Sequence, residues 1–347
     1  MTQKWFVKPL DGCVSSTGKP YKIALRKGTA NKLLVNFAGG GLSWSEETAA
    51  RPFRIGAMLG KKDFYYTGDV PSIAMKLLNS GIFNTKDRRN PFHDWHIVLI
   101  PYTSGDLHVG NNDYPFQNRK GENKVLYHHG NKNVASALAA LKEFFPQTPE
   151  TLVIAGQSAG GHGCVAHCPQ ISELYPACNN IVVYSEVSCL RSSLWPEIAK
   201  NVWNVPPDLM AYIKSEDLIA DLFRYAKDNM PPSARFLHFN SVWDGVNAKY
   251  MYKMNHGSLS INTQALQEYH DALSDVARTL KKEIPNYFYY LTDHEKSQKN
   301  GTTPHMFSDS QKRLHSKMQD GMSLAKWISK GIEDKPVDIG AKFARHI

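Results

Sequence analysis

The stretch Thr151–Gly163, TLVIAGQSAGGHG, decides the fold of this chain. Its opening run, Thr151–Ala155, predicts a short buried strand. The strand ends in Gly156-Gln-Ser-Ala-Gly160, the Gly-x-Ser-x-Gly pattern of a nucleophile elbow, in which a serine lies on a tight turn between a strand and a helix. Glycines allow such a turn because a Cβ on either side would clash with the strand or the helix. The sequence after the serine is typical of a helix, so this context favours Ser158 as a nucleophile over a purely structural turn.

A second glycine-rich segment follows an earlier predicted strand. Lys32–Phe37 is continuous enough in apolar residues to be a central strand, and it leads into Ala38-Gly-Gly-Gly-Leu42. In α/β-hydrolases a Gly-rich loop at this place supplies N–H groups that bind a developing oxyanion. A phosphate-binding loop is the alternative, but the segment lacks the Lys-Ser/Thr of a P-loop and the spacing of Gly-x-Gly-x-x-Gly. Candidates for the oxyanion-binding N–H groups are Gly40, Gly41 or Leu42, together with Ala159 at the start of the helix after the serine.

Acid and base candidates follow the nucleophile in the chain order that α/β-hydrolases use. Asp244 comes shortly after the predicted strand 235–239 and precedes a glycine, as expected of the acid that orients a catalytic histidine. An Asp-Gly turn is the alternative interpretation. Two histidines, His294 and His305, lie in the polar loop after the last predicted strand, 287–292. Either could act as the general base, and the residues alone leave that choice open.

Two other groups of polar residues are weaker candidates for a functional site. Asp106 and His108 follow the predicted strand 95–101 and could line a pocket, although such loop residues more often cap turns. The pair His128-His129 has no carboxylates or cysteines at metal-ligand spacing beside it. We therefore expect no metal site and no cofactor.

The composition indicates a globular chain. It has 347 residues, of which 42% are hydrophobic, enough for one large core. No window is long and apolar enough for a membrane helix, and the N-terminus lacks the apolar centre of a signal peptide, so the chain is expected to be cytoplasmic, or secreted if it is a mature form. The net charge of +9 suits an anionic partner, but the basic residues are scattered and match no nucleic-acid motif. Five cysteines are too few for a disulfide scaffold, although Cys168 and Cys178 could pair in an oxidising compartment.

The order of strands and helices predicts an α/β-hydrolase-like fold, with a mostly parallel central sheet and helices on both faces. We expect a single domain over residues 1–347. Segments 45–92 and 196–232 are predicted to be cap insertions over the sheet. The second segment, rich in apolar and aromatic residues, could equally be an ordinary helix pair packed on the sheet. The sequence does not indicate an oligomeric state.

In combination these motifs resemble the pectin acetylesterase/Notum family of serine carboxylesterases, over about residues 30–330. The resemblance points to Asp244 as the acid and to His305, rather than His294, as the base. Ser43 stands where the family usually has a cysteine. The segments that carry the resemblance are Ala38–Leu42, with leucine replacing the tryptophan of the family's Gly-Gly-Gly-Trp loop, Tyr102–Gly110, Gln157–Gly161, Trp243–Asn247 and Thr303–Met306.

The resemblance implies ester hydrolysis through an acyl-enzyme, with a triad of Ser158, Asp244 and His305. The expected substrate is an acylated carbohydrate carrying acetyl esters. One alternative is a lipid or protein O-deacylase with the same triad, in which aromatic residues of 196–232 would line the acyl pocket. The other is a glycan-binding relic that has lost catalysis. The resemblance also matches Cys168 to the family's cysteine after the nucleophile helix, with Cys178 as its candidate partner.

Overall fold

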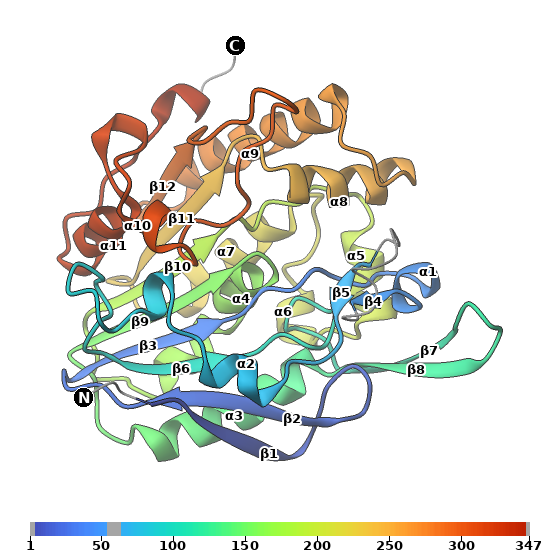
Figure 1. Cartoon of the computed structure of the whole chain (residues 1–347), viewed down its shortest axis with the longest axis horizontal. Coiled ribbons are helices and arrows are strands. Elements are labelled where there is room, and N and C mark those ends of the chain that lie inside the picture. Colours follow the sequence, from blue (N-terminus) through green and yellow to red (C-terminus); the bar gives the residue numbers. More distant parts are fainter. Residues whose placement is uncertain (1–3, 54–63, 345–347) are drawn as a thin grey trace.

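The fold is a layered arrangement of helices around one large sheet (Figure 1). The computed structural model describes residues 4–53 and 64–344. The strands of the large sheet are β1 (Phe6–Val14), β2 (Pro20–Arg26), β3 (Lys32–Phe37), β6 (His96–Ile100), β9 (Thr151–Gln157), β10 (Ile181–Glu186), β11 (Arg235–Ser241) and β12 (Tyr287–Thr292). Two further strand pairs are β4 (Pro52–Phe53) with β5 (Tyr66–Thr67), and β7 (Asn112–Gln117) with β8 (Asn123–His128).

Within the described ranges, the large sheet has the strand order β1-β2-β6-β3-β9-β10-β11-β12. The strands β1, β2 and β6 pair antiparallel, whereas pairing from β6 through β3 and β9 to β12 is parallel. Every residue of β9 and β10 is buried, as parallel strands covered on both faces require. The prediction of an α/β-hydrolase-like fold with a mostly parallel sheet is confirmed.

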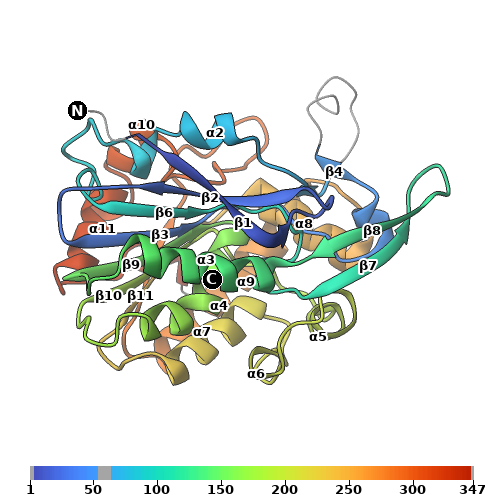
Figure 2. The same cartoon turned by 90° about the horizontal axis from the view of Figure 1, so that it is seen from below.

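Helices cover both faces of this sheet (Figure 2). Helices α3, α4, α7 and α9 enclose one hydrophobic core, and α2, α10 and α11 enclose a second core on the other face. None of the helices in the described part of the chain has the length and hydropathy that crossing a bilayer would need. The helical segments are α1 (Glu46–Ala49), α2 (Ser72–Lys76), η2 (Gly81–Phe83), α3 (Gly130–Phe144), α4 (Ala159–Glu173), α5 (Trp195–Glu197), η3 (Ile198–Val202), α6 (Pro207–Met210), α7 (Leu218–Asn229), α8 (Gly245–His256), α9 (Thr263–Glu283), α10 (Gln311–His315), η4 (Gln319–Gly321), α11 (Leu324–Ile332) and η5 (Ala341–Ala344).

The parallel strands end at one edge of the sheet, where ligands bind in open α/β sheets. The register pairs Phe37 of β3 with Gly156 of β9, and Gln157 of β9 with Glu186 of β10. The glycine-rich loop and the serine turn therefore leave neighbouring strands at the same height. This arrangement brings together segments that are far apart in the sequence.

The two predicted cap segments differ in their packing. Of the segment 45–92, residues 54–63 lie outside the described residues, and the remainder forms α1, β4, β5, α2 and η2. In the segment 196–232, helix α7 packs on α4 and α9, as an ordinary layer helix does. The earlier part of that segment instead contacts the start of the β7–β8 hairpin, since the Asn111 N–H donates to the Trp203 carbonyl at 2.8 Å.

Candidate active site

Ser158 lies on a strained turn between β9 and α4. Its backbone angles are φ 56° and ψ −122°, which residues with a side chain rarely adopt. The flanking glycines make room for the turn. A Cβ on Gly156 would lie 1.9 Å from the Gly160 oxygen, and a Cβ on Gly160 would lie 2.0 Å from the Phe37 oxygen. The Gly-x-Ser-x-Gly segment thus forms the sharp strand-to-helix turn that its sequence predicts.

The glycine-rich loop 38–42 passes directly beside this serine. A Cβ on Gly39 would lie 2.8 Å from the Cβ of Ser158 and 2.4 Å from the Gln157 oxygen. Because both distances are shorter than real Cβ contacts, only glycine fits at this position without a shift of the backbone. The loop and the serine turn therefore form one continuous wall of a cavity.

The candidate oxyanion donors differ in availability. The N–H of Leu42 already donates to the Tyr65 carbonyl at 2.8 Å, so an oxyanion would have to displace this bond. Leu42 is therefore a poor oxyanion donor, in contrast to the sequence-based expectation. Gly40 and Gly41 both line the cavity. The N–H of Ala159 is at the first position of α4, where backbone N–H groups have no acceptor within the helix.

Asp244 is fully buried at the N-terminus of α8. Its Oδ1 accepts the backbone N–H groups of Val246 at 2.8 Å and Asn247 at 3.1 Å. Its Oδ2 accepts a hydrogen bond from His305 Nδ1 at 2.6 Å. The side chain thus caps α8, since it accepts two backbone N–H groups that have no acceptor within the helix. The two interpretations of the Asp-Gly pair are thus compatible, because one carboxylate caps a helix and binds a histidine.

A short pairing of distant segments brings His305 to Asp244. Thr303 forms an isolated parallel bridge with Asp244, and its N–H donates to the Trp243 carbonyl at 2.9 Å. His305 follows two residues later and lines the same cavity as the candidate nucleophile. His294 is not among the cavity-lining residues that the structure describes. The structure therefore brings His305, and not His294, to the predicted site.

The environment of His305 suits a general base. Burial lowers the pKa of the His305 imidazole, but the negative charges of Asp244, Glu186 and Asp309 outweigh burial, so its pKa is raised above 6.5. Because Nδ1–H is donated to Asp244, the neutral ring carries its free acceptor on Nε2. As the pH falls through the raised pKa, the ring takes up a proton and can no longer act as a base.

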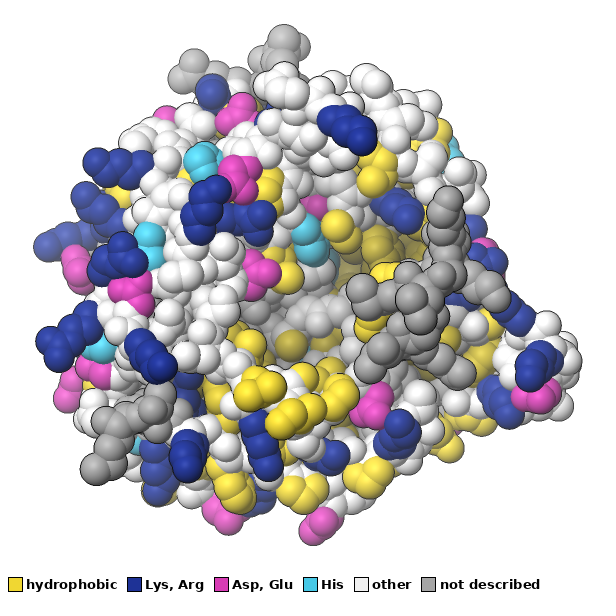
Figure 3. Space-filling view, in the orientation of Figure 1, with side chains coloured by type: hydrophobic (Ala, Val, Ile, Leu, Met, Phe, Trp, Pro, Cys, Tyr) yellow, Lys and Arg dark blue, Asp and Glu magenta, His cyan; other side chains and the backbone are white. Residues whose placement is uncertain are grey.

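One cavity of about 450 Å³ joins the serine, the histidine and the glycine-rich loop. A hollow bordered by hydrophobic side chains lies near the centre of the face in Figure 3. No residue of the segment 196–232 is among the lining residues described, so the expectation that its aromatic side chains form an acyl pocket is not met. The apolar walls come from other segments: Leu42, Leu78, Ile82, Phe83, Leu99, Leu107, Leu190, Val246 and Met306.

Asp106 and His108 form hydrogen bonds with loops next to the cavity. The buried Asp106 carboxylate accepts the Ser104 hydroxyl at 2.5 Å and the Gly130 N–H at 2.7 Å. Burial lowers the pKa of His108 to about 3, so its ring is neutral, and its Nε2 is 2.9 Å from the Ala38 carbonyl of the glycine-rich loop. Neither residue is among the described lining residues of the cavity. Asp106 thus organises a turn, as the sequence favoured, and His108 holds the glycine-rich loop in place.

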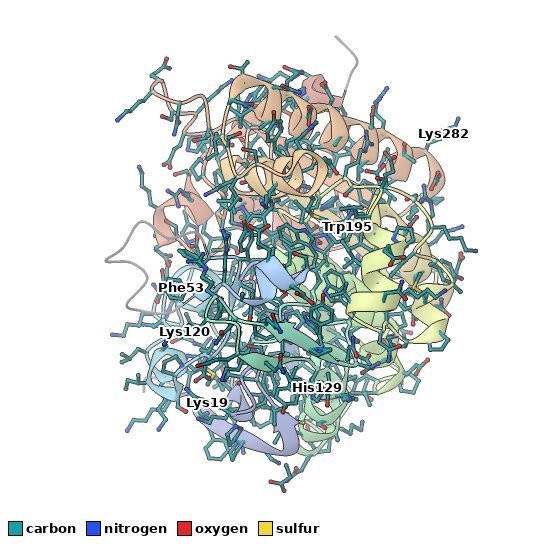
Figure 4. The ribbon with its side chains drawn as sticks, turned by 90° about the vertical axis from the view of Figure 1, so that its right-hand side faces the viewer. Lys19, Phe53, Lys120, His129, Trp195 and Lys282 are labelled. Atoms are coloured by element: carbon teal, nitrogen blue, oxygen red, sulfur yellow. The ribbon has the colours of Figure 1, made fainter. Side chains whose placement is uncertain are left out.

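The remaining sequence candidates lie away from the cavity. His129 is bonded to Asp113 at 2.5 Å across the β7–β8 hairpin, which Figure 4 views end-on with Lys120 near its tip. Among the described residues, no three His, Cys, Asp or Glu side chains are grouped as metal ligands. All five cysteines are buried free thiols, so Cys168 and Cys178 are not joined in this structure.

Sequence reasoning missed two parts of the site. The walls formed by Leu78, Ile82 and Phe83 follow no local pattern, because they become neighbours of the serine only through the tertiary fold. Glu186 ends the apolar strand β10 as a fully buried carboxylate. A charged residue at the carboxyl end of an otherwise apolar strand was the signal that could have identified it.

Comparisons with known proteins identify the family of this chain. A family model described as Pectinacetylesterase matches residues 10–194, just over half of the chain. That region contains the glycine-rich loop and the serine turn, whereas Asp244 and His305 lie beyond it.

Solved structures of the Wnt deacylase Notum from Drosophila, in two crystal forms, match nearly the whole chain. One has 16% sequence identity and a TM-score of 0.64, with 99% of this chain and 96% of that chain covered. The other has 17% identity and a TM-score of 0.65, with 98% and 96% covered. At this level of identity the match shows a shared fold. The chain belongs to the pectinacetylesterase family, and it is a serine carboxylesterase.

Proposed function

We propose that Ser158 is the nucleophile of this esterase, with His305 as general base and Asp244 as the acid that orients the histidine. The observation that carries the proposal is the 2.6 Å bond between His305 Nδ1 and a buried, helix-capping Asp244, at a cavity also lined by a strained serine. A serine on an unfavourable backbone conformation and an imidazole oriented by a carboxylate, both lining one cavity, are the groups that acyl transfer needs.

In the proposed reaction, His305 Nε2 accepts the proton of the Ser158 hydroxyl as Oγ attacks the acyl carbonyl. Asp244 stabilises the imidazolium that forms. The histidine then gives its proton to the leaving alcohol, and the acyl group stays on the serine. Water, deprotonated by the same histidine, attacks this acyl-enzyme. The bond between Ser158 Oγ and the acyl carbon then breaks, the acid is released, and the imidazolium returns its proton to Oγ. The oxyanion of both tetrahedral intermediates would be held by backbone N–H groups of Gly40, Gly41 and Ala159.

The cavity favours acyl groups longer than acetyl, and hence a lipid or protein O-deacylase. Its volume is about 450 Å³ and its walls include Leu78, Ile82, Phe83 and Leu99. An acetyl group has one methyl to bury there, whereas each further buried CH₂ contributes about 0.8 kcal/mol, roughly fourfold in kcat/KM. The Notum structures with the shared fold are described as those of a Wnt deacylase. Acetylated carbohydrate, the substrate expected from the sequence, becomes the second candidate, and the net charge of +9 agrees with an acidic carrier of the ester.

A series of p-nitrophenyl esters from acetate to dodecanoate tests this proposal. We expect kcat/KM to rise with chain length until the cavity is filled. Ile82→Phe should lower kcat/KM for the long esters and leave kcat/KM for acetate unchanged, because the larger side chain narrows the cavity. Leu194→Phe serves as the matched control, since Leu194 is 40% exposed and outside the described cavity lining. A maximum on acetate, with acetate release from acetylated glycans, would favour the carbohydrate esterase instead.

Loss of catalysis is tested separately. A fluorophosphonate probe should label the protein at Ser158, because only an activated serine reacts with it. Absence of labelling together with absence of turnover on all esters would identify a non-catalytic relic. Labelling without the expected chain-length profile would leave the nucleophile in place and overturn only the acyl preference.

A further inference from the structure

Glu186 is a buried carboxylate that the proposed reaction does not use. It is the last residue of β10 and is 0% exposed. No lysine or arginine within the described ranges forms an ion pair with it. A buried charge without a counter-ion is costly unless hydrogen bonds replace the lost water. The bonds that Glu186 makes should therefore indicate why it is there.

The Glu186 side chain holds the segment that follows the candidate base. One carboxylate oxygen, Oε1, accepts the backbone N–H of Phe307 at 2.6 Å and that of Ser308 at 3.1 Å. The other oxygen, Oε2, accepts the hydroxyl of Tyr184 at 3.0 Å. In all three bonds a carboxyl oxygen of Glu186 is the acceptor. Phe307 and Ser308 are the second and third residues after His305.

The Glu186 main chain holds the nucleophile turn. Its carbonyl oxygen accepts the backbone N–H of Ser158 at 2.8 Å. The parallel register of β9 and β10, which pairs Gln157 with Glu186, places this carbonyl beside the turn. One residue therefore bonds directly to the serine through its backbone and to the histidine loop through its side chain.

We propose that Glu186 is a positioning residue that fixes the His305 loop relative to Ser158. The proposal deepens the proposed function, because it rests on Ser158 and His305 being the nucleophile and the base. The bridge between Thr303 and Asp244 restrains the chain before the histidine, and Glu186 restrains the chain after it. With both sides held, the imidazole has a fixed place from which to reach the serine hydroxyl.

The charge of Glu186 also acts on the histidine. The charged groups that face His305 are Asp244 at the start of α8, Glu186 at the end of β10 and Asp309 in the loop itself, and all three raise its pKa. Burial raises the pKa of the Glu186 carboxyl and Asp309 adds to this, while the Ser308 side chain and the N–H groups of Phe307 and Ser308 lower it. Removing the charge of Glu186 without removing its bonds should therefore lower the pKa of His305.

The first test removes the side-chain restraint. Glu186→Ala should lower kcat on p-nitrophenyl esters by about 10²-fold, the effect of displacing a catalytic group by about 1 Å, with a smaller change in KM. Rates are divided by the number of sites titrated with fluorophosphonate, so that unfolded protein does not count.

Asp221→Ala is the matched control for this test. The Asp221 carboxylate is 3% exposed, and one of its oxygens accepts two backbone N–H groups, of Lys214 at 2.9 Å and Ser215 at 2.8 Å. It restrains a loop outside the cavity lining described for this chain. Asp221→Ala should therefore lower the melting temperature and leave kcat per titrated site unchanged. The same behaviour in Glu186→Ala would show a merely structural role and overturn the proposal.

A conservative variant keeps the proposal testable if Glu186→Ala does not fold. In Glu186→Gln the amide oxygen can accept the N–H groups of Phe307 and Ser308, and the amide nitrogen can donate to Tyr184. This variant should retain most of kcat at high pH and shift the acidic limb of the kcat/KM profile to lower pH. An unshifted limb would overturn the proposal. Absence of fluorophosphonate labelling at Ser158 in the unaltered enzyme would instead refute the proposed nucleophile, so the two failures are distinguishable.

Discussion

The two halves of the candidate site are held together by different kinds of contact. The serine and the glycine-rich loop directly follow β9 and β3, which are hydrogen-bonded neighbours paired through Gly156 and Phe37. The acid and the base are carried on longer excursions, since Asp244 comes three residues after β11 ends at Ser241, and His305 comes thirteen residues after β12 ends at Thr292. Sheet register therefore positions the first half. Side-chain hydrogen bonds and one isolated bridge position the second.

This difference predicts that substitutions act differently in the two halves of the site. Residues at strand ends are placed by the sheet, so a substitution there alters chemistry or local strain. Residues on long loops depend on a few specific bonds, and losing one bond should displace the group it holds.

The largest effect is expected from Ser158→Ala, which removes the proposed nucleophile from the half of the site that the sheet positions. Turnover of p-nitrophenyl esters should fall by about 10⁴–10⁶-fold, the range seen when a serine nucleophile is removed. Circular dichroism should show an unchanged fold. Ser158→Gly should be equally inactive but more stable, by about 1 kcal/mol, because glycine relieves the positive φ of 56° at this position. Turnover retained in either variant would refute the assignment.

Asp244→Asn alters the hydrogen bond between Asp244 and His305, which joins the two segments of the second half of the site. The expected loss in kcat is about 10⁴-fold, because an amide no longer fixes the Nδ1–H tautomer of His305. Stability should change little, since asparagine is also a favourable helix cap and can accept the N–H groups of Val246 and Asn247.

The pH profile of the same variant provides a second measurement. The Asp244 charge is the largest of the contributions that raise the pKa of His305. Activity requires the neutral ring, so the unaltered enzyme loses activity as the pH falls through a pKa above 6.5. The residual activity of Asp244→Asn should persist to lower pH. An unchanged kcat and an unshifted acidic limb in this variant would mean that Asp244 acts only as a helix cap.

The same contrast explains what could be predicted from the sequence. Ser158 and the glycine-rich loop were identifiable because each directly follows an apolar strand, so a local motif and its context are sufficient. Asp244 was identifiable from its place after a strand. The choice between His294 and His305 was open on the residues alone, because no local pattern states which part of a thirteen-residue loop returns to the sheet. Only the resemblance to a family favoured His305.

The parts that could not be predicted are those made by tertiary contact. The N–H of Leu42 is used by Tyr65, a residue of another segment, so its loss as an oxyanion donor has no sequence signal. The hairpin Asn112–His128 was also missed, because its strand Asn112–Gln117 alternates half-buried and exposed positions, with few of the apolar residues that mark core strands. Leu78 and Phe83 line the cavity but lie far from Ser158 in the sequence, so no local pattern predicts that they belong to its wall.

A smaller effect is expected from Gly39→Ala, which tests the contact between the loop and the serine turn. The added Cβ would lie 2.4 Å from the Gln157 oxygen, so the loop must move away and carry Gly40 and Gly41 with it. Loss of one oxyanion donor costs about 10²–10³-fold in kcat, and we expect a decrease in this range. Gly68→Ala is the control, because its nearest neighbour, the Ser16 hydroxyl, would be 3.3 Å away. Equal activity in both variants would argue against an oxyanion role for this loop.

The smallest effect separates the two histidines of the second half. His294→Ala should leave kcat/KM within about twofold of the unaltered enzyme, whereas His305→Ala should lose activity nearly as completely as Ser158→Ala. The reason is positional, since His305 bonds to Asp244 and lines the cavity, while His294 leaves β12 at its end and packs near Phe307, with ring centroids 6.4 Å apart. Both variants remove one imidazole from the same loop, so the comparison controls for general effects on loop stability. If His294→Ala were the inactive variant, the bonds that hold His305 would serve the fold alone, and the base would have to reach Ser158 from the near end of the loop.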